Sequence, residues 1–247
     1  MKRMKTHKTH NYLGPKQPIF KSKFQAGLFI STIAAFAFYC AMLIISQNVK
    51  AEGSRVNPMW VSAPTMKEMI NANRSALFHQ ADDPWKGAET PQITMVYFTD
   101  FNCPYCKKLE PELDKLMAEY PQLKVIVKMV PLQGQSSVEA VDFAQRVWMN
   151  EPDKYLKLKE MLMASPRRLD SQTIAKVAAM TNTSQWLSQA DASISPAISD
   201  NLELMRGLRL GGTPSMVIGE NIIVGLVPFS QLKQQVEQAL EAQDEHG

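Results

Sequence analysis

The stretch Val96-Tyr-Phe-Thr-Asp-Phe-Asn-Cys103-Pro-Tyr-Cys106-Lys-Lys108 holds two of the three cysteines in this 247-residue chain. The third, Cys40, lies far upstream in an apolar segment. The apolar run Ile93–Phe98 predicts a buried strand, and apolar residues at helical spacing begin at Cys106. The chain therefore concentrates its sulfur at one strand-to-helix turn, and this favours redox chemistry over a framework of structural disulfides.

The position of Cys103 gives its sulfur a distinct chemistry. It falls at or just before the first helical turn, where unpaired backbone N–H groups and the positive end of the helix dipole face it. These lower the pKa of a thiol, and the thiolate is the attacking form in disulfide exchange. Cys106 lies three residues on, on the same helix face, and can reach back to resolve a mixed disulfide. Pro104 suits the first helical position, where no N–H donor is needed.

Two other uses of a Cys-x-x-Cys pair stay open at this point. A structural zinc site needs four ligands, yet beyond residue 50 the chain adds only His79 and His246, neither at ligand spacing to the pair. A purely structural disulfide between Cys103 and Cys106 is the other alternative. We expect a redox-active pair that uses neither a metal nor a cofactor.

Around these cysteines the sequence resembles the active-site segment of a known family. It is similar to the DsbA-like (DsbA/ScsC/DsbG-type) bacterial envelope thiol–disulfide oxidoreductases of the thioredoxin superfamily. Further segments carry the resemblance: Asp83–Gly87, Lys124–Pro131 and Leu210–Ile218. Together they span residues 83–242. The resemblance implies an α/β thioredoxin fold with a helical insertion.

The resemblance also implies roles for single residues. Cys103 would be the nucleophile and Cys106 the resolving thiol of a redox-active disulfide. The Thr213–Pro214 bond would be cis and would pack beside the sulfurs. The backbone of Thr213 could then pair with an extended substrate segment, in the manner of an added strand.

The residues between and near these positions complete the expected site. Pro104 and Tyr105 separate the two cysteines, and with Thr213 they would tune the reduction potential. Gly211 and Gly212 would leave room for a substrate backbone to approach.

One position departs from the family pattern. The family often carries a buried Asp or Glu six residues before the first cysteine, and this chain has Tyr97 there. A phenol has a reference pKa of about 10 and does not easily accept a proton near neutral pH. Lys128 resembles the basic residue often found opposite that acid. We expect Lys128 to hydrogen-bond the phenol or to reach solvent, so that Lys128 or water handles the proton. The alternative is that Tyr97 is only a core aromatic.

The N-terminal region predicts membrane attachment. Residues 1–24 are basic and lack acids, and the uncharged, mostly apolar run Ala26–Ile45 is long enough to span a bilayer. We predict a cytoplasmic flank over 1–24 and a transmembrane signal anchor over 25–46. The rest would lie on the periplasmic face of the inner membrane. The alternative is a long signal peptide cleaved near Ala51, which would leave a soluble periplasmic protein.

The charge balance argues against nucleic-acid binding. The chain has 27 Lys and Arg against 24 Asp and Glu, and seven of the 27 lie in residues 1–24. The remainder has 27 − 7 = 20 basic residues against 24 acidic ones, a formal charge of −4. The mild overall basicity therefore belongs to the predicted membrane flank.

Residues 47–82 predict a linker and a short amphipathic helix. Thr65 and Glu68 form a capping-box pattern at the start of that helix. Its apolar face would contain Met66, Met69, Ile70 and Leu77. Such a helix packs on its own domain or pairs protomers into a homo-oligomer, and both alternatives stay open.

Residues 83–245 predict the thioredoxin-like domain. After the active-site helix we expect a strand over Leu123–Val130 and a helical insertion over about 136–210. A hairpin over Ser215–Ile218 and Asn221–Val224, turning at Gly219-Glu220, follows. A terminal helix would start near Ser230.

The sequence thus predicts an enzyme that forms, reduces or isomerises disulfides. Its substrates would be cysteine-containing envelope proteins, and a membrane redox partner would recycle it. The direction of exchange stays open, although Thr before the proline resembles isomerase or reductase branches. The alternative is a non-catalytic membrane-tethered chaperone or Cu(I)-binding module using the same thiols. The methionines do not favour copper, because most fall at core spacing and serve as gap-fillers. Examples are Met149, Met161, Met163 and Met180.

Overall fold

The computed structural model describes residues 63–187 and 195–244. These residues belong to one compact unit of the chain. The predicted anchor over 25–46, its basic flank and the alternative cleavage site near Ala51 lie outside the described residues. Among the helices within 63–187 and 195–244, none combines the length and the apolar character of a bilayer span.

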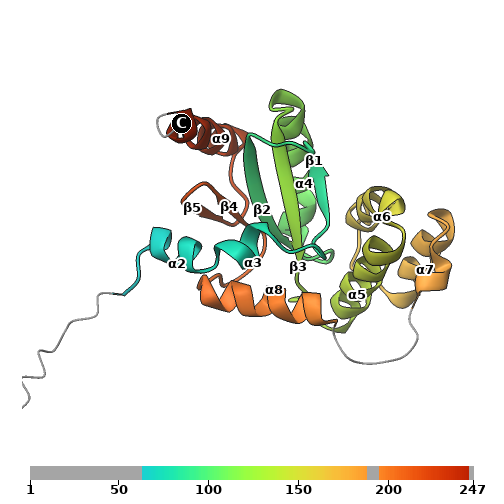
Figure 1. The fold of residues 1–247 in the computed structure, drawn as a ribbon. Coiled ribbons are helices and arrows are strands. Elements are labelled where there is room, and N and C mark those ends of the chain that lie inside the picture. Colours follow the sequence, from blue (N-terminus) through green and yellow to red (C-terminus); the bar gives the residue numbers. More distant parts are fainter. Residues whose placement is uncertain (1–62, 188–194, 245–247) are drawn as a thin grey trace, which may run out of the picture. The chain divides into compact units, whose positions relative to one another are not determined.

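The described strands form a five-stranded sheet in the order β1-β3-β2-β4-β5 (Figure 1). Strand β2 runs parallel to β3 and antiparallel to β4, and β1 and β5 are antiparallel edge strands. The strand bounds are Trp85–Gly87, Ile93–Thr99, Leu123–Met129, Ser215–Ile218 and Asn221–Val224, for β1 to β5. The central strand β2 is apolar along most of its length, which suits a strand that is covered on both faces of the sheet.

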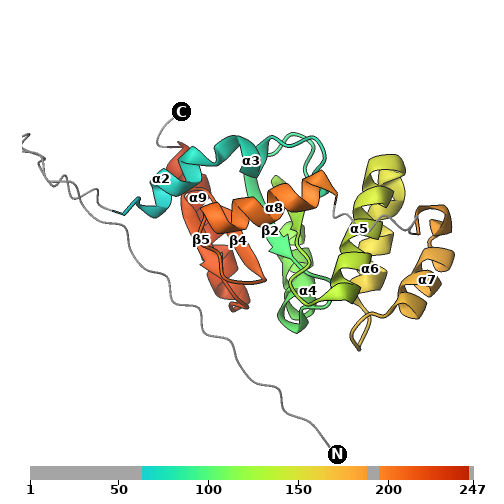
Figure 2. The ribbon, with the colours of Figure 1, turned by 90° about the horizontal axis from the view of Figure 1, so that it is seen from below.

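Helices cover each face of the sheet. On one face, α4 (Pro104–Glu119) and α9 (Phe229–Asp244) pack on apolar residues of β2, β3 and β4. On the other lie α2 (Met66–Ala72), α3 (Arg74–Phe78) and α8 (Pro196–Gly207), as Figure 2 shows from below. The predicted order of strands and helices is confirmed, including the hairpin β4–β5 and the terminal helix.

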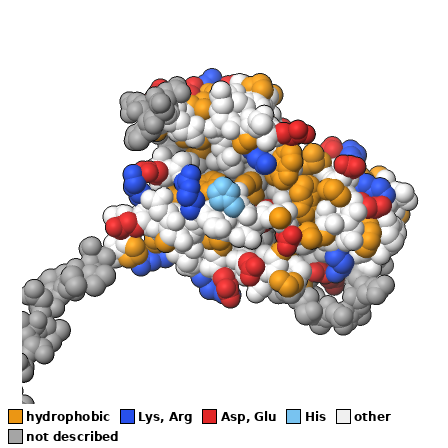
Figure 3. Space-filling model, in the orientation of Figure 1, with side chains coloured by type: hydrophobic (Ala, Val, Ile, Leu, Met, Phe, Trp, Pro, Cys, Tyr) orange, Lys and Arg blue, Asp and Glu red, His pale blue; other side chains and the backbone are white. Residues whose placement is uncertain are grey.

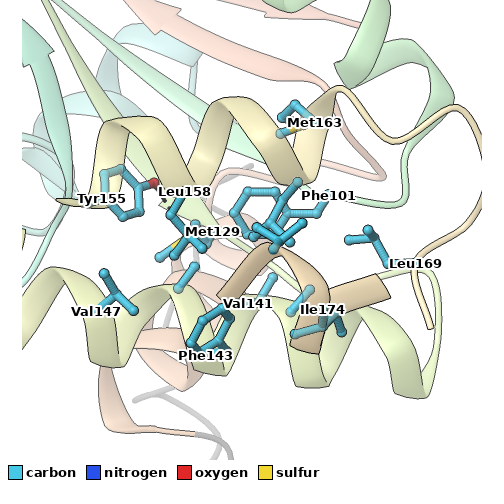
Figure 4. Packing of buried hydrophobic residues seen from close by; sticks show 14 of the residues in the cluster. Phe101, Met129, Val141, Phe143, Val147, Tyr155, Leu158, Met163, Leu169 and Ile174 are labelled. Atoms are coloured by element: carbon cyan, nitrogen blue, oxygen red, sulfur yellow. Dashed lines mark hydrogen bonds between the residues drawn. The ribbon is translucent and has the colours of Figure 1, made fainter. Parts of the chain in front are cut away.

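The segment between β3 and β4 is helical, as predicted. It contains α5 (Gln135–Asn150), α6 (Pro152–Met163), α7 (Ser171–Met180), a short 3₁₀ helix (Ser184–Trp186) and α8. Helices α5 to α7 enclose a core of their own that reaches the sheet through Met129 and the active-site loop through Phe101 (Figure 4). The hydroxyl of Tyr155 donates to Met129 Sδ at 3.6 Å, and its ring meets Trp148 edge-on with 5.4 Å between centroids.

The methionines of this segment do not all fill the core. Met163 is buried and Met161 packs partly against the core, as expected. Met149 and Met180 are 51% and 73% exposed, so the prediction that they are gap-fillers is wrong. Helical spacing placed them near the boundary of the apolar face, and both lie in the last turn of their helices.

Hydrophobic side chains gather on the surface where α6 lies next to the sheet (Figure 3).

The predicted amphipathic helix forms and packs on its own domain. Its capping box is present, since Thr65 Oγ1 accepts from the Glu68 backbone and Glu68 Oε2 accepts from the Thr65 backbone at 2.7 Å. The helix is interrupted at Asn73, and Ile70 and Leu77 are buried against the sheet. Met66, at the start of the predicted apolar face, is 44% exposed. The apolar face covers the sheet only beyond the first turn of α2.

Candidate active site

The two cysteines lie where β2 passes into α4. Cys103 is the N-cap of α4 with extended backbone angles, and Pro104 occupies the first helical turn. The Cys103 N–H donates to Asp100 O at 3.0 Å, which closes the turn before the helix. Cys103 is 2% exposed, Cys106 is fully buried, and both are free thiols. The sequence therefore puts one sulfur at the start of the helix, almost completely buried, and the other one turn further along the helix, completely buried.

The surroundings of the two sulfurs separate their acidities. The thiol of Cys106 donates to the sulfur of Cys103, and this is the largest cause that lowers the pKa of Cys103 to about 5. Thr213 and the backbone N–H groups of Tyr105 and Cys106 lower it further, against the opposing effect of burial. Burial raises the pKa of Cys106, and its bond to Cys103 raises it again. Near neutral pH the pair therefore holds one thiolate, on Cys103, and one thiol.

The loop between α8 and β4, which follows the helical insertion, completes the site. The Cys103 thiol lies 3.2 Å from the carbonyl oxygen of Thr213, and the Thr213–Pro214 peptide bond is cis. The loop is held by Ser215 Oγ, which donates to Gly212 O at 2.7 Å, and by the Gly225 N–H, which donates to Pro214 O at 2.8 Å.

The approach to this loop is open. A Cβ added at Gly211 or Gly212 would meet no atom within 4 Å. Tyr105 is 56% exposed, with Lys108 Nζ 6.0 Å from its ring centre. The site therefore presents a thiolate, an accessible backbone segment and an exposed aromatic side chain at one surface.

Tyr97 lies beneath the buried sulfur. It is fully buried on the α4 face of β2, and its hydroxyl accepts from Thr99 Oγ1 at 3.0 Å. Its hydroxyl also hydrogen-bonds Cys106. Burial first, and then the charges of Glu110 and Cys106, raise the pKa of Tyr97 well above its usual range. Tyr97 is therefore a core aromatic and, at the same time, a neutral hydrogen-bond donor next to Cys106.

Lys128 does not join this site, and both predicted destinations of its side chain are wrong. In the parallel register Tyr97 pairs with Val127, whereas Lys128 pairs with Phe98. Because successive side chains of a strand point to opposite faces, Lys128 lies on the α3–α8 side of the sheet. There it is buried, donates to Ala76 O at 2.6 Å and forms an ion pair with Asp83.

Two polar residues that the sequence did not single out hold the active-site turn. The buried Asp100 accepts from the N–H of Asn102 and from Ser137 Oγ through Oδ1. Its Oδ2 accepts from the backbone N–H groups of Leu132 and Gln133 at 2.7 and 2.8 Å. The carboxylate thus joins the turn before Cys103 to the loop after β3. The sequence signal that could have identified Asp100 was an acidic residue directly after a predicted buried strand.

Asn102 joins the same turn to the helical insertion. Its Nδ2 donates to Ser136 Oγ and Ser137 Oγ, both at 3.0 Å, and its Oδ1 accepts from the Leu169 N–H at 2.7 Å. Lys107 adds a second link, because its Nζ donates to the carbonyl oxygens of Ser165 and Arg167. The position of Cys103 therefore depends on the insertion.

Within residues 63–187 and 195–244, no group of three or more His, Cys, Asp or Glu could hold a metal ion.

Comparisons with known proteins agree with this geometry. A family described as Thioredoxin matches residues 79–238. Disulfide bond formation protein D of Bacillus subtilis is 19% identical over 170 residues, covering 64% of this chain and 77% of that protein. The structure of the catalytic domain of Proteus mirabilis ScsC is similar with a TM-score of 0.67 and 36% identity, covering 72% of this chain and 99% of that one. A periplasmic thioredoxin-like protein from Salmonella enterica serovar Typhimurium gives a TM-score of 0.63 at 34% identity, covering 69% and 97%.

Proposed function

The chain belongs to the DsbA-like thiol–disulfide oxidoreductases of the thioredoxin superfamily, and from that premise we propose that it exchanges disulfides with cysteine-containing envelope proteins through Cys103 and Cys106. The observation that carries the proposal is the contrast between the two sulfurs. The thiolate of Cys103 at the helix start is suited to attack, and the more deeply buried thiol hydrogen-bonded to it is suited to resolve.

In the oxidising direction, a substrate thiolate attacks Cys103 in the Cys103–Cys106 disulfide. Cys106 leaves and takes up a proton. A second substrate thiolate then attacks the substrate sulfur of the mixed disulfide, and Cys103 leaves as a thiolate. In the reducing direction, the Cys103 thiolate attacks one sulfur of a substrate disulfide, and the other substrate sulfur leaves as a thiolate. Cys106 then loses its proton and attacks Cys103, which re-forms the Cys103–Cys106 bond and releases the second substrate thiolate.

We propose that the oxidising direction dominates. The pKa of about 5 at Cys103 supports this, because a stabilised thiolate stabilises the reduced enzyme and makes its disulfide a stronger oxidant. The expected reduction potential lies above about −180 mV. A potential well below that value would instead favour the isomerase or reductase direction that Thr213 resembles.

We also propose that residues 25–46 anchor the enzyme in the inner membrane with its active site in the periplasm. The basic flank of residues 1–24 supports this orientation. A periplasmic active site would meet thiol substrates in an oxidising compartment, and a membrane redox partner would restore the disulfide. The similar Salmonella protein is named as periplasmic.

The experiment that tests the function compares single cysteine variants of the full chain in insulin reduction and in refolding of reduced ribonuclease. We expect Cys103→Ala to abolish turnover and Cys106→Ala to accumulate mixed disulfides. Cys40→Ala, which removes the cysteine outside the motif, serves as the control. Full turnover by Cys103→Ala would contradict the proposal. Stoichiometric Cu(I) uptake without exchange would favour the metal-binding alternative.

A further inference from the structure

The loop between α6 and α7, residues 164–170, is fastened to both sides of Cys103. Lys107, one helical turn after Cys103 on α4, donates from Nζ to two carbonyl oxygens of this loop at 2.7 and 3.0 Å. Asn102, directly before Cys103, accepts from the Leu169 N–H at 2.7 Å. Leu169 is buried in the same apolar cluster as Cys103. The loop is therefore a fixed neighbour of the reactive sulfur.

Two arginines of this loop lie next to the active-site turn. Arg167 and Arg168 are both exposed, and Nε of Arg168 donates to Ser136 Oγ at 3.3 Å. The same hydroxyl oxygen accepts from Asn102 Nδ2 at 3.0 Å. A single hydroxyl group thus connects the Arg168 guanidinium to the residue that precedes Cys103.

A third cation lies on the exposed side of the active-site helix. Lys108 Nζ is 6.0 Å from the ring centre of Tyr105, one of the two residues between the cysteines. Lys108, Arg167 and Arg168 form no ion pair with a carboxylate of residues 63–187 and 195–244. These three side chains are called the basic surface below.

The acids near the basic surface make other contacts. Asp170 follows the two arginines, but its Oδ1 accepts from the Thr173 N–H at 2.7 Å and caps α7. Glu139 accepts from Ser171 Oγ at 2.7 Å. Asp100 is fully buried and holds the active-site turn. None of these three carboxylates pairs with an arginine of the loop, so positive charge remains available at the surface.

We propose that the basic surface selects substrates by attracting the carboxylates of Asp and Glu residues that flank the reactive cysteine of an envelope protein. The inference rests on the proposed exchange function and assigns the substrate class of the same site. The chemistry of exchange is unchanged, since the Cys103 thiolate attacks one sulfur of the substrate disulfide and the other sulfur leaves as a thiolate. The basic surface acts before this step, on the encounter between the substrate and Cys103.

The sign of the charge effect distinguishes this surface from the thiolate itself. A bare thiolate repels an acidic substrate, so a simple thiol should react faster with a disulfide that is flanked by lysines. Cations beside the sulfur reverse that order. At about 10 Å in water, one pair of opposite unit charges changes a rate about twofold before screening, so several pairs give about three- to tenfold.

The test uses peptides that differ only in the residues on either side of one cysteine, which is held in a disulfide with thionitrobenzoate. The flanking residues are Asp, Ser or Lys, and the leaving group is the same in each peptide. The parent protein is the reduced full chain with Cys40→Ala, so that the thiols of the motif alone react. Attack of Cys103 on the peptide sulfur releases thionitrobenzoate, whose absorbance is followed at neutral pH.

The expected result is a preference for the acidic peptide. We expect the Asp peptide to react with the parent protein about three- to tenfold faster than the Lys peptide at low ionic strength. Raising the ionic strength from about 0.01 M to about 0.15 M should reduce this preference, because salt screens exposed charges. Mercaptoethanol, a thiol without a basic surface, should prefer the Lys peptide.

Variants separate charge from structure. The double variant Arg167→Gln, Arg168→Gln should lose most of the preference. Its matched control, Arg74→Gln with Arg206→Gln, removes the same charge from α3 and α8 on the other face of the sheet and should keep it. Arg168→Lys retains the charge while changing the contact with Ser136, so it should keep the preference as well. Thermal melting checks that each variant is folded.

Three outcomes would overturn the proposal. The first is a folded Arg167→Gln, Arg168→Gln variant that keeps the preference of the parent protein. The second is a parent protein that reacts faster with the Lys peptide than with the Asp peptide. The third is loss of the preference in Arg168→Lys, which would assign the effect to the shape of the loop. Failure of the Ser peptide to release thionitrobenzoate would instead contradict the exchange function.

Discussion

The sulfur of Cys103 lies 3.2 Å from the carbonyl oxygen of Thr213, a residue 110 positions further along the chain. The pairing of β2 with β4 brings these residues together, because Phe98 is opposite Ser215 in that ladder. The Thr213 hydroxyl is buried, with no nitrogen or oxygen atom hydrogen-bonded to it among the described residues. Thr213 is nevertheless one of the groups that lower the pKa of Cys103.

The first prediction concerns that hydroxyl. Thr213→Val keeps the shape of the side chain and removes the donor, so we expect the pKa of Cys103 to rise from about 5. The pH dependence of the alkylation rate of Cys103 measures the shift. Thr213→Ser retains a hydroxyl and should keep the original midpoint. Identical midpoints for Thr213→Val and the unmodified chain would show that the backbone of Thr213, and not its hydroxyl, lowers the pKa of Cys103.

The acidity of Cys103 predicts how the stability of the reduced protein depends on pH. The pKa of Cys103 is about 5 in the folded state, against about 8.5 for an unfolded thiol. Its contribution to stability is therefore complete above about pH 8.5 and is lost as the pH falls toward 5. The oxidised protein has no such thiol. We expect the urea midpoint of the reduced form to rise with pH relative to the oxidised form between these limits. A constant difference would contradict the assigned pKa.

Asn102 is predicted to couple the insertion to the active-site turn. Asn102→Ala leaves the buried Leu169 N–H without its acceptor, which should reduce the free energy of unfolding by about 1–3 kcal/mol. Urea unfolding measures the loss. Asn150→Ala removes an amide that donates to Arg146 O on an exposed surface, and this control should change stability little. Equal effects of the two changes on the free energy of unfolding would show that the Asn102 contacts do not stabilise the fold.

Lys128 is predicted to stabilise the fold without affecting exchange. Lys128→Met leaves Asp83 buried without a cation, which should destabilise the protein by about 3–5 kcal/mol near pH 7.5. Burial raises the pKa of Asp83 to about 6 even beside Lys128, and loss of the lysine raises it further, so protonation should relieve part of the loss as the pH falls toward 5. Unfolding at about pH 5 and 7.5 measures this.

Two further observations complete that prediction. Lys67→Met breaks only an exposed pair with Glu220 and should cost little at either pH. The alkylation profile of Cys103 should not change in Lys128→Met, because Lys128 lies on the other face of the sheet. A shift of the Cys103 alkylation profile in Lys128→Met would show that Lys128 does act on the active site.

The strands and the active-site helix could be predicted because each carries a local signal. An apolar run ends at Thr99, proline follows the first cysteine, and two short apolar runs flank Gly219-Glu220. The interruption of the N-terminal helix at Asn73 could not be predicted, because Asn is tolerated inside helices and no glycine or proline marks the position.

The positions of the charged side chains depend on pairing that the sequence does not give. The register that puts Lys128 opposite Phe98 also turns it away from Tyr97, and one residue of difference would reverse this.

The most direct measurement of the central claim is site-resolved alkylation of the reduced full chain as a function of pH. Mass spectrometry identifies which cysteine reacts. We expect one equivalent of label on Cys103 with a midpoint near pH 5, while Cys106 stays unlabelled through neutral pH. Labelling of both cysteines with a common midpoint near that of a free thiol, about 8.5, would contradict the division of the pair into attacking thiolate and resolving thiol.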